Sequence, residues 1–140
     1  MSEVRRFADP TALASAAAQY VLETLQGVIA TRGRALVALA GGATPKELYE
    51  RLGEVSSATF PWGQVHLFWG DERFVPYDSP DSNFRLAEES LLSRGAVPLG
   101  NVHPVPVEEA DPEAAARAYE LALRGFLPEA GPSFDLTVLG

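Results

Sequence analysis

The sequence predicts a parallel-sheet α/β fold, a Rossmann-like three-layer αβα sandwich. Three short runs of apolar residues, at 35–40, 65–69 and 134–139, are the first observation. Such continuous runs are typical of strands buried on both faces, as in parallel sheets. Segments with helical spacing of apolar residues separate the runs, and this alternation is the second observation. The third is that glycine-rich or charged residues follow the first two runs, where parallel sheets bind ligands.

In the first half of the chain, a helix is expected to begin at Asp9-Pro10 and to end at Gly33. Aspartate is a favoured N-cap, proline is tolerated at the first helical position, and glycine is common just after a helix. A strand at 35–40 follows. Residues 41–44 break this strand, and a second helix is expected over 45–53.

The second half continues the alternation of strands and helices. Its short helix-spaced segments favour two further helices, each with a polar residue that can cap its start. The elements expected are a strand at 65–69, a helix at 83–94, a short strand at 102–103, a helix beginning at Asp111-Pro112, a turn at 128–133 and a strand at 134–139.

Composition and charge restrict the classes of function. The 140 residues include no cysteine, so disulfides and cysteine-based zinc sites are excluded. The net charge of −8 disfavours nucleic acid as a partner, and no apolar run approaches the roughly 18–20 residues that span a bilayer. We therefore expect a cytoplasmic protein without membrane contact. Residues 1–73 carry −1 and residues 74–140 carry −7, so the first half is the better place for an anion site.

The first candidate site is the segment from Gly41 to Pro45, between a strand and a helix. Two glycines let the backbone approach a ligand closely, and free N–H groups at a helix start favour an anion. The donors would be the N–H groups of Gly41, Gly42, Ala43 and Thr44, with the Thr44 hydroxyl. A simple turn capped by Thr44 is the alternative. The segment matches neither common nucleotide-binding glycine motif.

The second candidate site is Gly70-Asp71-Glu72-Arg73, which follows the strand at 65–69. Arg73 is suited to a two-pronged contact with phosphate, and Asp71 can accept hydrogen bonds from sugar hydroxyls. The alternative is a solvated loop whose charges pair with one another. The nearby run Asp81-Ser82-Asn83 reads either as a helix cap or as a third segment that reaches the ligand.

The two histidines are interpreted as structural residues. His66 lies inside an apolar strand and His103 in a loop-rich stretch, and neither has a carboxylate pair nearby in the sequence. We therefore expect His66 to be a hydrogen-bonded histidine of the core and His103 to have a structural role, and we expect no metal site. No cofactor is expected either.

Two runs of the sequence resemble a known family. The run 39–45, with Tyr49, is similar to the phosphate loop shared by 6-phosphogluconolactonases and glucosamine-6-phosphate deaminases. The run 69–75, followed by 81–85, is similar to the lactonase signature specifically. Deaminases typically have Asp-Glu-Tyr where this chain has Asp71-Glu72-Arg73.

The resemblance implies hydrolysis of 6-phosphoglucono-1,5-lactone to 6-phosphogluconate in the oxidative pentose phosphate pathway, without a metal. The implied partner is a small phosphosugar lactone, and the oligomeric state stays open. The phosphate or loop residues would be Gly41, Gly42, Thr44 and Arg73, and the residues near the sugar would be Asp71 and Asn83.

The resemblance places the family's general-base histidine beyond Gly140, so no catalytic residue is expected within this chain. Residues 1–140 are accordingly expected to form a single phosphosugar-binding α/β domain that is incomplete at its C-terminal side. Two alternatives remain. A deaminase-like enzyme would share the glycine loop but not Arg73, and a non-catalytic phosphosugar-binding domain would need the loop and no base.

Overall fold

A computed structural model describes residues 2–129, 131 and 133–140. Its centre is a parallel three-stranded sheet in the order β2-β1-β3, with β1 at Ala35–Leu39, β2 at Val65–Trp69 and β3 at Leu136–Thr137. All five residues of β1 are buried, because helices cover both faces of the sheet. The α/β fold class expected from the apolar runs is therefore confirmed.

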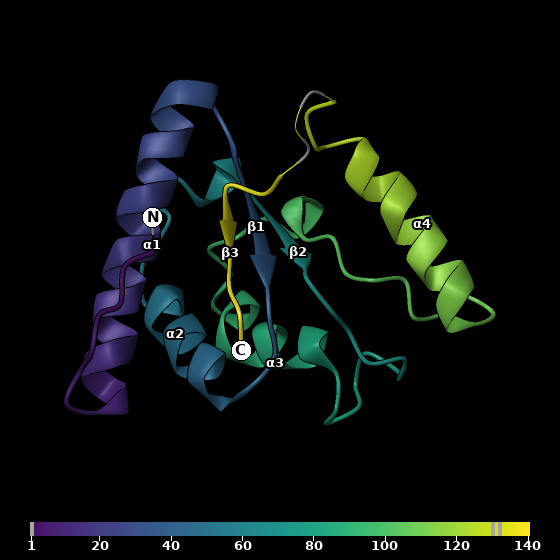
Figure 1. Ribbon diagram of the computed structural model, residues 1–140, viewed down its shortest axis with the longest axis horizontal. Coiled ribbons are helices and arrows are strands. Elements are labelled where there is room, and N and C mark those ends of the chain that lie inside the picture. Colours follow the sequence, from purple (N-terminus) through teal and green to yellow (C-terminus); the bar gives the residue numbers. More distant parts are fainter. Residues whose placement is uncertain (1, 130, 132) are drawn as a thin grey trace.

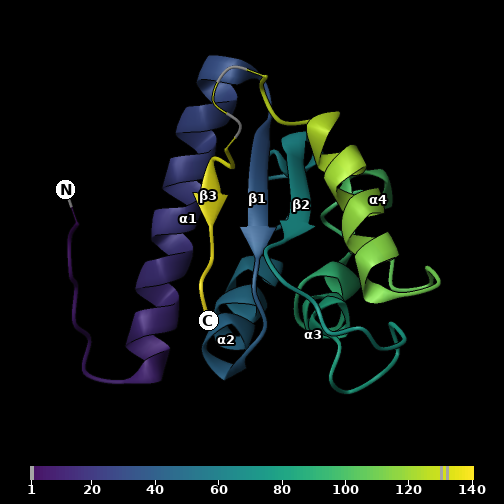
Figure 2. The same ribbon diagram turned by 45° about the vertical axis from the view of Figure 1, so that its right-hand side comes forward.

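The α-helices of the described residues pack around the sheet, and they are α1 (Pro10–Arg32), α2 (Ala43–Gly53), α3 (Asn83–Ser90) and α4 (Pro112–Arg124). Figure 2 shows α1 and α4 on opposite sides of the sheet. Figure 1 shows α2 and α3 near the ends of the strands where the arrows point. None of the helices in the described part of the chain has the length and apolar character needed to cross a bilayer.

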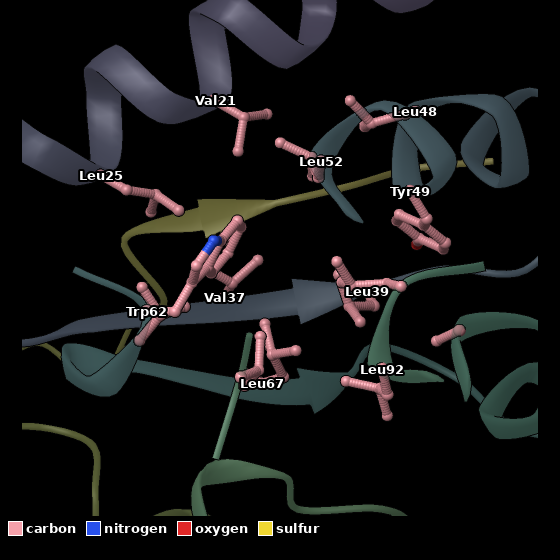
Figure 3. Close-up of a cluster of buried hydrophobic side chains, with 14 of the residues drawn as sticks. Val21, Leu25, Val37, Leu39, Leu48, Tyr49, Leu52, Trp62, Leu67 and Leu92 are labelled. Atoms are coloured by element: carbon pink, nitrogen blue, oxygen red, sulfur yellow. The ribbon is translucent and has the colours of Figure 1, made fainter. Parts of the chain in front are cut away.

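The larger core lies on the face of the sheet that α1, α2 and α3 cover. Side chains at alternate strand positions, such as Val37 and Leu67, meet Leu25 of α1 and Leu52 of α2 (Figure 3). A smaller cluster on the other face joins Leu36 and Phe68 to Tyr119 of α4. The period of two along each strand thus divides the apolar residues between the two helical layers.

The expected helix caps are confirmed. Asp9 accepts a hydrogen bond from the Ala12 N–H at 2.8 Å, and Asp111 accepts one from the Ala114 N–H at 2.8 Å. Gly33 ends α1 in the left-handed conformation, with φ of 81°. The short strand expected at 102–103 is present as a single parallel bridge between Val102 and Leu67 of β2.

Several boundaries differ from the expectation, and β1 ends one residue early, at Leu39. Helix α2 begins at Ala43, two residues early, because Gly42 at φ 114° turns the chain and Pro45 is tolerated within the first turn. Helix α3 stops at Ser90 because Leu91 leaves helical geometry, and a separate 3₁₀ turn covers Leu92–Arg94. In the last run, only residues 136–137 form strand ladder. The turn expected at 128–133 includes residues 130 and 132, which lie outside the described residues.

Candidate functional site

The glycine loop begins where β1 ends and is held there by Tyr49 of the following helix. The Tyr49 hydroxyl donates to the Ala40 carbonyl at 2.6 Å and accepts from the Ala40 N–H at 2.8 Å. Tyr49 is completely buried, and burial raises the pKa of its hydroxyl to about 12, so the donor proton stays in place at neutral pH. Tyr49 thus holds both the N–H and the carbonyl of Ala40, the residue that precedes the two glycines.

The start of α2 presents exposed backbone next to this anchor. Gly42, Ala43 and Thr44 are exposed, and the Lys46 N–H makes the first helical bond, to the Gly42 carbonyl at 3.1 Å. A helix start carries partial positive charge and favours anions. Thr44 lies inside the first turn, so the alternative in which its side chain caps the helix is wrong: the cap position is Gly42 and has no side-chain bond.

Asn83 brings the second loop to the first. Its side chain is buried, and its Nδ2 donates to the Asp71 carbonyl at 3.2 Å, with the Asp71 carboxylate 3.5 Å away. The Oδ1 of the same amide occupies the space that a Cβ at Gly41 would need. Three predicted site residues, Gly41, Asp71 and Asn83, are therefore close together at the ends of β1 and β2.

Glu72 has a role that the sequence reasoning missed. Its carboxylate accepts hydrogen bonds from the N–H groups of Asn83 and Phe84, at 2.7 and 2.9 Å, where α3 begins. The Arg73 N–H donates to it at 2.8 Å, and the Ser82 hydroxyl at 3.4 Å. Known capping motifs place the acidic residue within the same helix turn, so a partner about ten residues earlier gives no sequence signal.

Arg73 and Thr44 lie in separate hollows of the surface. Arg73 is exposed and lines a pocket of about 400 Å³ with Asp71 and, from α4, Tyr119 and Glu120. Thr44 lines a different pocket, of about 470 Å³, which Arg5 also borders. The structure thus does not bring all the predicted phosphate contacts into one cavity. The phosphate roles of Gly42, Thr44 and Arg73 stay predictions.

The two histidines pair with each other away from these loops. His66 Nδ1 and His103 Nε2 are 3.0 Å apart, and the rings stack. Burial lowers the pKa of both rings; the positive charge of Arg34 adds to the effect on His66, and that of His66 to the effect on His103. The expectation that His66 is hydrogen-bonded is confirmed, although the pairing with His103 was not anticipated.

The amino-acid sequence matches the family model described as glucosamine-6-phosphate isomerases/6-phosphogluconolactonase over residues 8–140. The chain belongs to this family. The match includes both strand-end loops, so the resemblance seen in those loops extends over nearly the whole chain.

Individual members of the family are similar to the chain in sequence and in structure. The 6-phosphogluconolactonase of Synechocystis sp. is 49% identical over 115 residues, which cover 80% of this chain and 47% of that protein. A solved 6-phosphogluconolactonase from Trypanosoma brucei superposes with a TM-score of 0.84 at 31% identity, covering 98% of this chain and 58% of that one. The corresponding Thermotoga maritima structure gives a TM-score of 0.79 at 38% identity, covering 91% and 55%.

A glucosamine-6-phosphate deaminase structure also superposes, with a TM-score of 0.75 but at 19% identity, and this likeness concerns the fold alone. The chain spans about half the length of the curated relatives that it matches.

Proposed function

We propose that this chain carries the phosphosugar-binding part of a 6-phosphogluconolactonase, which hydrolyses 6-phosphoglucono-1,5-lactone to 6-phosphogluconate in the oxidative pentose phosphate pathway. The contact that carries the proposal is the Asn83 amide, which joins the Asp71 loop to Gly41 at the ligand-binding edge of the sheet. The relatives named as 6-phosphogluconolactonases support it.

The proposed roles follow from the chemistry of each group. The N–H groups of Gly41, Gly42 and Thr44, beside the start of α2, would hold the phosphate, and Arg73 would add a positive charge. The Asp71 carboxylate would accept hydrogen bonds from the sugar hydroxyls, and the Asn83 amide would donate hydrogen bonds to them. Fixing the phosphate far from the lactone carbonyl orients the reacting group, because binding energy from a remote part of the substrate restricts its motion.

The proposal assigns no general base to residues 1–140. Hydrolysis of a lactone needs a base that activates water near the carbonyl. His66 and His103 bond to each other beside Phe126, and neither lines the pocket that holds Asp71 and Arg73. We propose that residues 1–140 form a single phosphosugar-binding α/β domain that binds a small-molecule substrate in the cytoplasm, without nucleic acid.

The test is a calorimetric titration of the chain with three ligands: 6-phosphogluconate, gluconate and glucosamine-6-phosphate. We expect 6-phosphogluconate to bind most tightly, and gluconate, which lacks the phosphate, to bind at least about tenfold more weakly, because charged hydrogen bonds are lost. Tighter binding of glucosamine-6-phosphate would favour the deaminase-like alternative. Equal binding of gluconate and 6-phosphogluconate would contradict the proposed phosphate site.

A further inference from the structure

The carboxylate of Glu72 holds two separate parts of the candidate site at once. We propose that Glu72 is a positioning residue, whose carboxylate sets the Asn83 amide and the Arg73 backbone relative to the glycine loop. The ligand-binding consequence of this role rests on the proposed function, whereas its structural consequence does not.

The first step of the argument is the division of donors between the two carboxylate oxygens. Oε1 accepts from the N–H groups of Asn83 at 2.7 Å and Arg73 at 2.8 Å, and Oε2 accepts from the Phe84 N–H at 2.9 Å. An ionised carboxylate is an acceptor at every lone pair, so it can take all these donors together. Because Asn83 and Arg73 share one oxygen, their backbones are fixed relative to each other.

The second step is the position of these donors at the start of α3. The first N–H groups of a helix have no partner within the helix. Here the N–H groups of Asn83 and Phe84 bond to Glu72, and the Arg85 N–H bonds to the Ser82 hydroxyl at 3.2 Å. A negative charge is favourable at this end of a helix. The place of α3 at the site therefore depends on a side chain from the loop after β2.

The third step runs from the Asn83 backbone to its side chain. With its N–H held by Glu72, the buried Asn83 directs Nδ2 to the Asp71 carbonyl at 3.2 Å and Oδ1 against Gly41. The amide lies so close to Gly41 that no side chain could be accommodated there. A small shift of the start of α3 therefore displaces the amide from both Gly41 and Asp71.

The test compares Glu72→Gln with a control variant, Glu88→Gln, which changes an exposed glutamate within α3, the helix that Glu72 caps. A glutamine presents an NH₂ group to donors that need an acceptor, so about half of the contacts are lost. The readouts on the full chain are the NMR signals of the Asn83 side-chain amide and the Gly41 N–H, the affinity for 6-phosphogluconate and the melting temperature.

For Glu72→Gln we expect the Asn83 side-chain amide to lose its protection from hydrogen exchange, the Gly41 N–H signal to shift, and the dissociation constant to rise about tenfold. Glu88→Gln should change none of these. If Glu72→Gln does not fold, Glu72→Asp replaces it in the comparison, because it keeps the charge on a shorter side chain. Full retention of the Asn83 and Gly41 signals in Glu72→Asp would overturn the proposal.

A different result separates positioning from simple helix capping. If Glu72→Gln lowers the melting temperature but leaves the Asn83 and Gly41 signals and the affinity unchanged, Glu72 only caps α3 and the proposal is wrong. If the unaltered chain does not bind 6-phosphogluconate, the proposed function fails, while the NMR signals still decide the positioning role.

Discussion

At the scale of single residues, the candidate site depends on how closely Gly41 approaches Asn83. The Asn83 carboxamide fills the space that a side chain at Gly41 would require, and the Asn83 side chain is itself held by Asp71. The glycine is therefore needed for space, whereas Gly42, at φ 114°, is needed for its backbone conformation.

We predict that Gly41→Ala lowers the free energy of unfolding by about 1–3 kcal/mol, the usual cost of overpacking, and weakens binding of 6-phosphogluconate. Urea unfolding and calorimetry measure the two effects. Gly63→Ala is the control, because a Cβ there meets nothing within 4 Å. Equal stability of the two variants would show that Asn83 moves aside without cost.

The sequence predicts the proximity of some candidate site residues, whereas their binding roles stay predictions. Gly41, Asp71 and Asn83 were predicted from their place after strands or at a helix start, and the structure brings them together because parallel strands end at one edge. The sequence gives no signal for the role of Glu72, because the residues that it joins at the start of α3 lie ten or more positions away. The role predicted for the Arg73 side chain is a contact with a ligand, and the pattern of residues does not specify where that ligand lies.

At the scale of elements, α4 is tied to the sheet by polar contacts as well as by apolar ones. The Tyr119 hydroxyl accepts from the Trp69 N–H at 2.8 Å and donates to the His103 carbonyl at 2.8 Å. Burial raises the pKa of this hydroxyl far above its ordinary value, so the proton is retained. The His66–His103 pair packs against Phe126, just after α4.

We predict that stability falls as the pH drops below about 6.5, in part because of this pair. The pKa of each ring is lowered in the folded chain, so the unfolded chain binds protons first and is favoured on acidification. Thermal melting between pH 7.5 and 5.5 measures the slope. The double variant His66→Gln/His103→Gln should show a smaller slope than the unaltered chain, and an unchanged slope would contradict the assignment.

The sequence predicted the existence of the elements better than their limits. The Asp-Pro pairs gave the starts of α1 and α4 correctly because capping is local. The sequence places the start of α2 two residues late because proline is favoured at the first helical position, whereas Pro45 is the third residue of this helix. The break after Ser90 depends on the backbone of Leu91, a residue that is compatible with a helix, so no local signal marked it.

At the scale of the whole molecule, the arrangement follows from the alternation of strands and helices. The sheet lies between α1 and α4 (Figure 2), and side chains of α2 and α3 belong to the core cluster on the α1 face. The loops that follow β1 and β2 come together through Gly41, Asp71 and Asn83. The order β2-β1-β3 places β1 in the centre, which explains why its five residues are all buried. The central claim is that the edge where these loops meet is one phosphosugar site.

The most direct test of this claim is the affinity of Arg73→Ala for 6-phosphogluconate, measured by calorimetry beside Arg117→Ala, an exposed arginine on α4. Loss of a charged hydrogen bond costs roughly 1.5–3 kcal/mol, so we predict a dissociation constant about 10- to 150-fold higher for Arg73→Ala. Arg117→Ala should bind as the unaltered chain does. Equal affinity of the two variants would contradict the claim that the Asp71-Glu72-Arg73 loop and the glycine loop share one ligand.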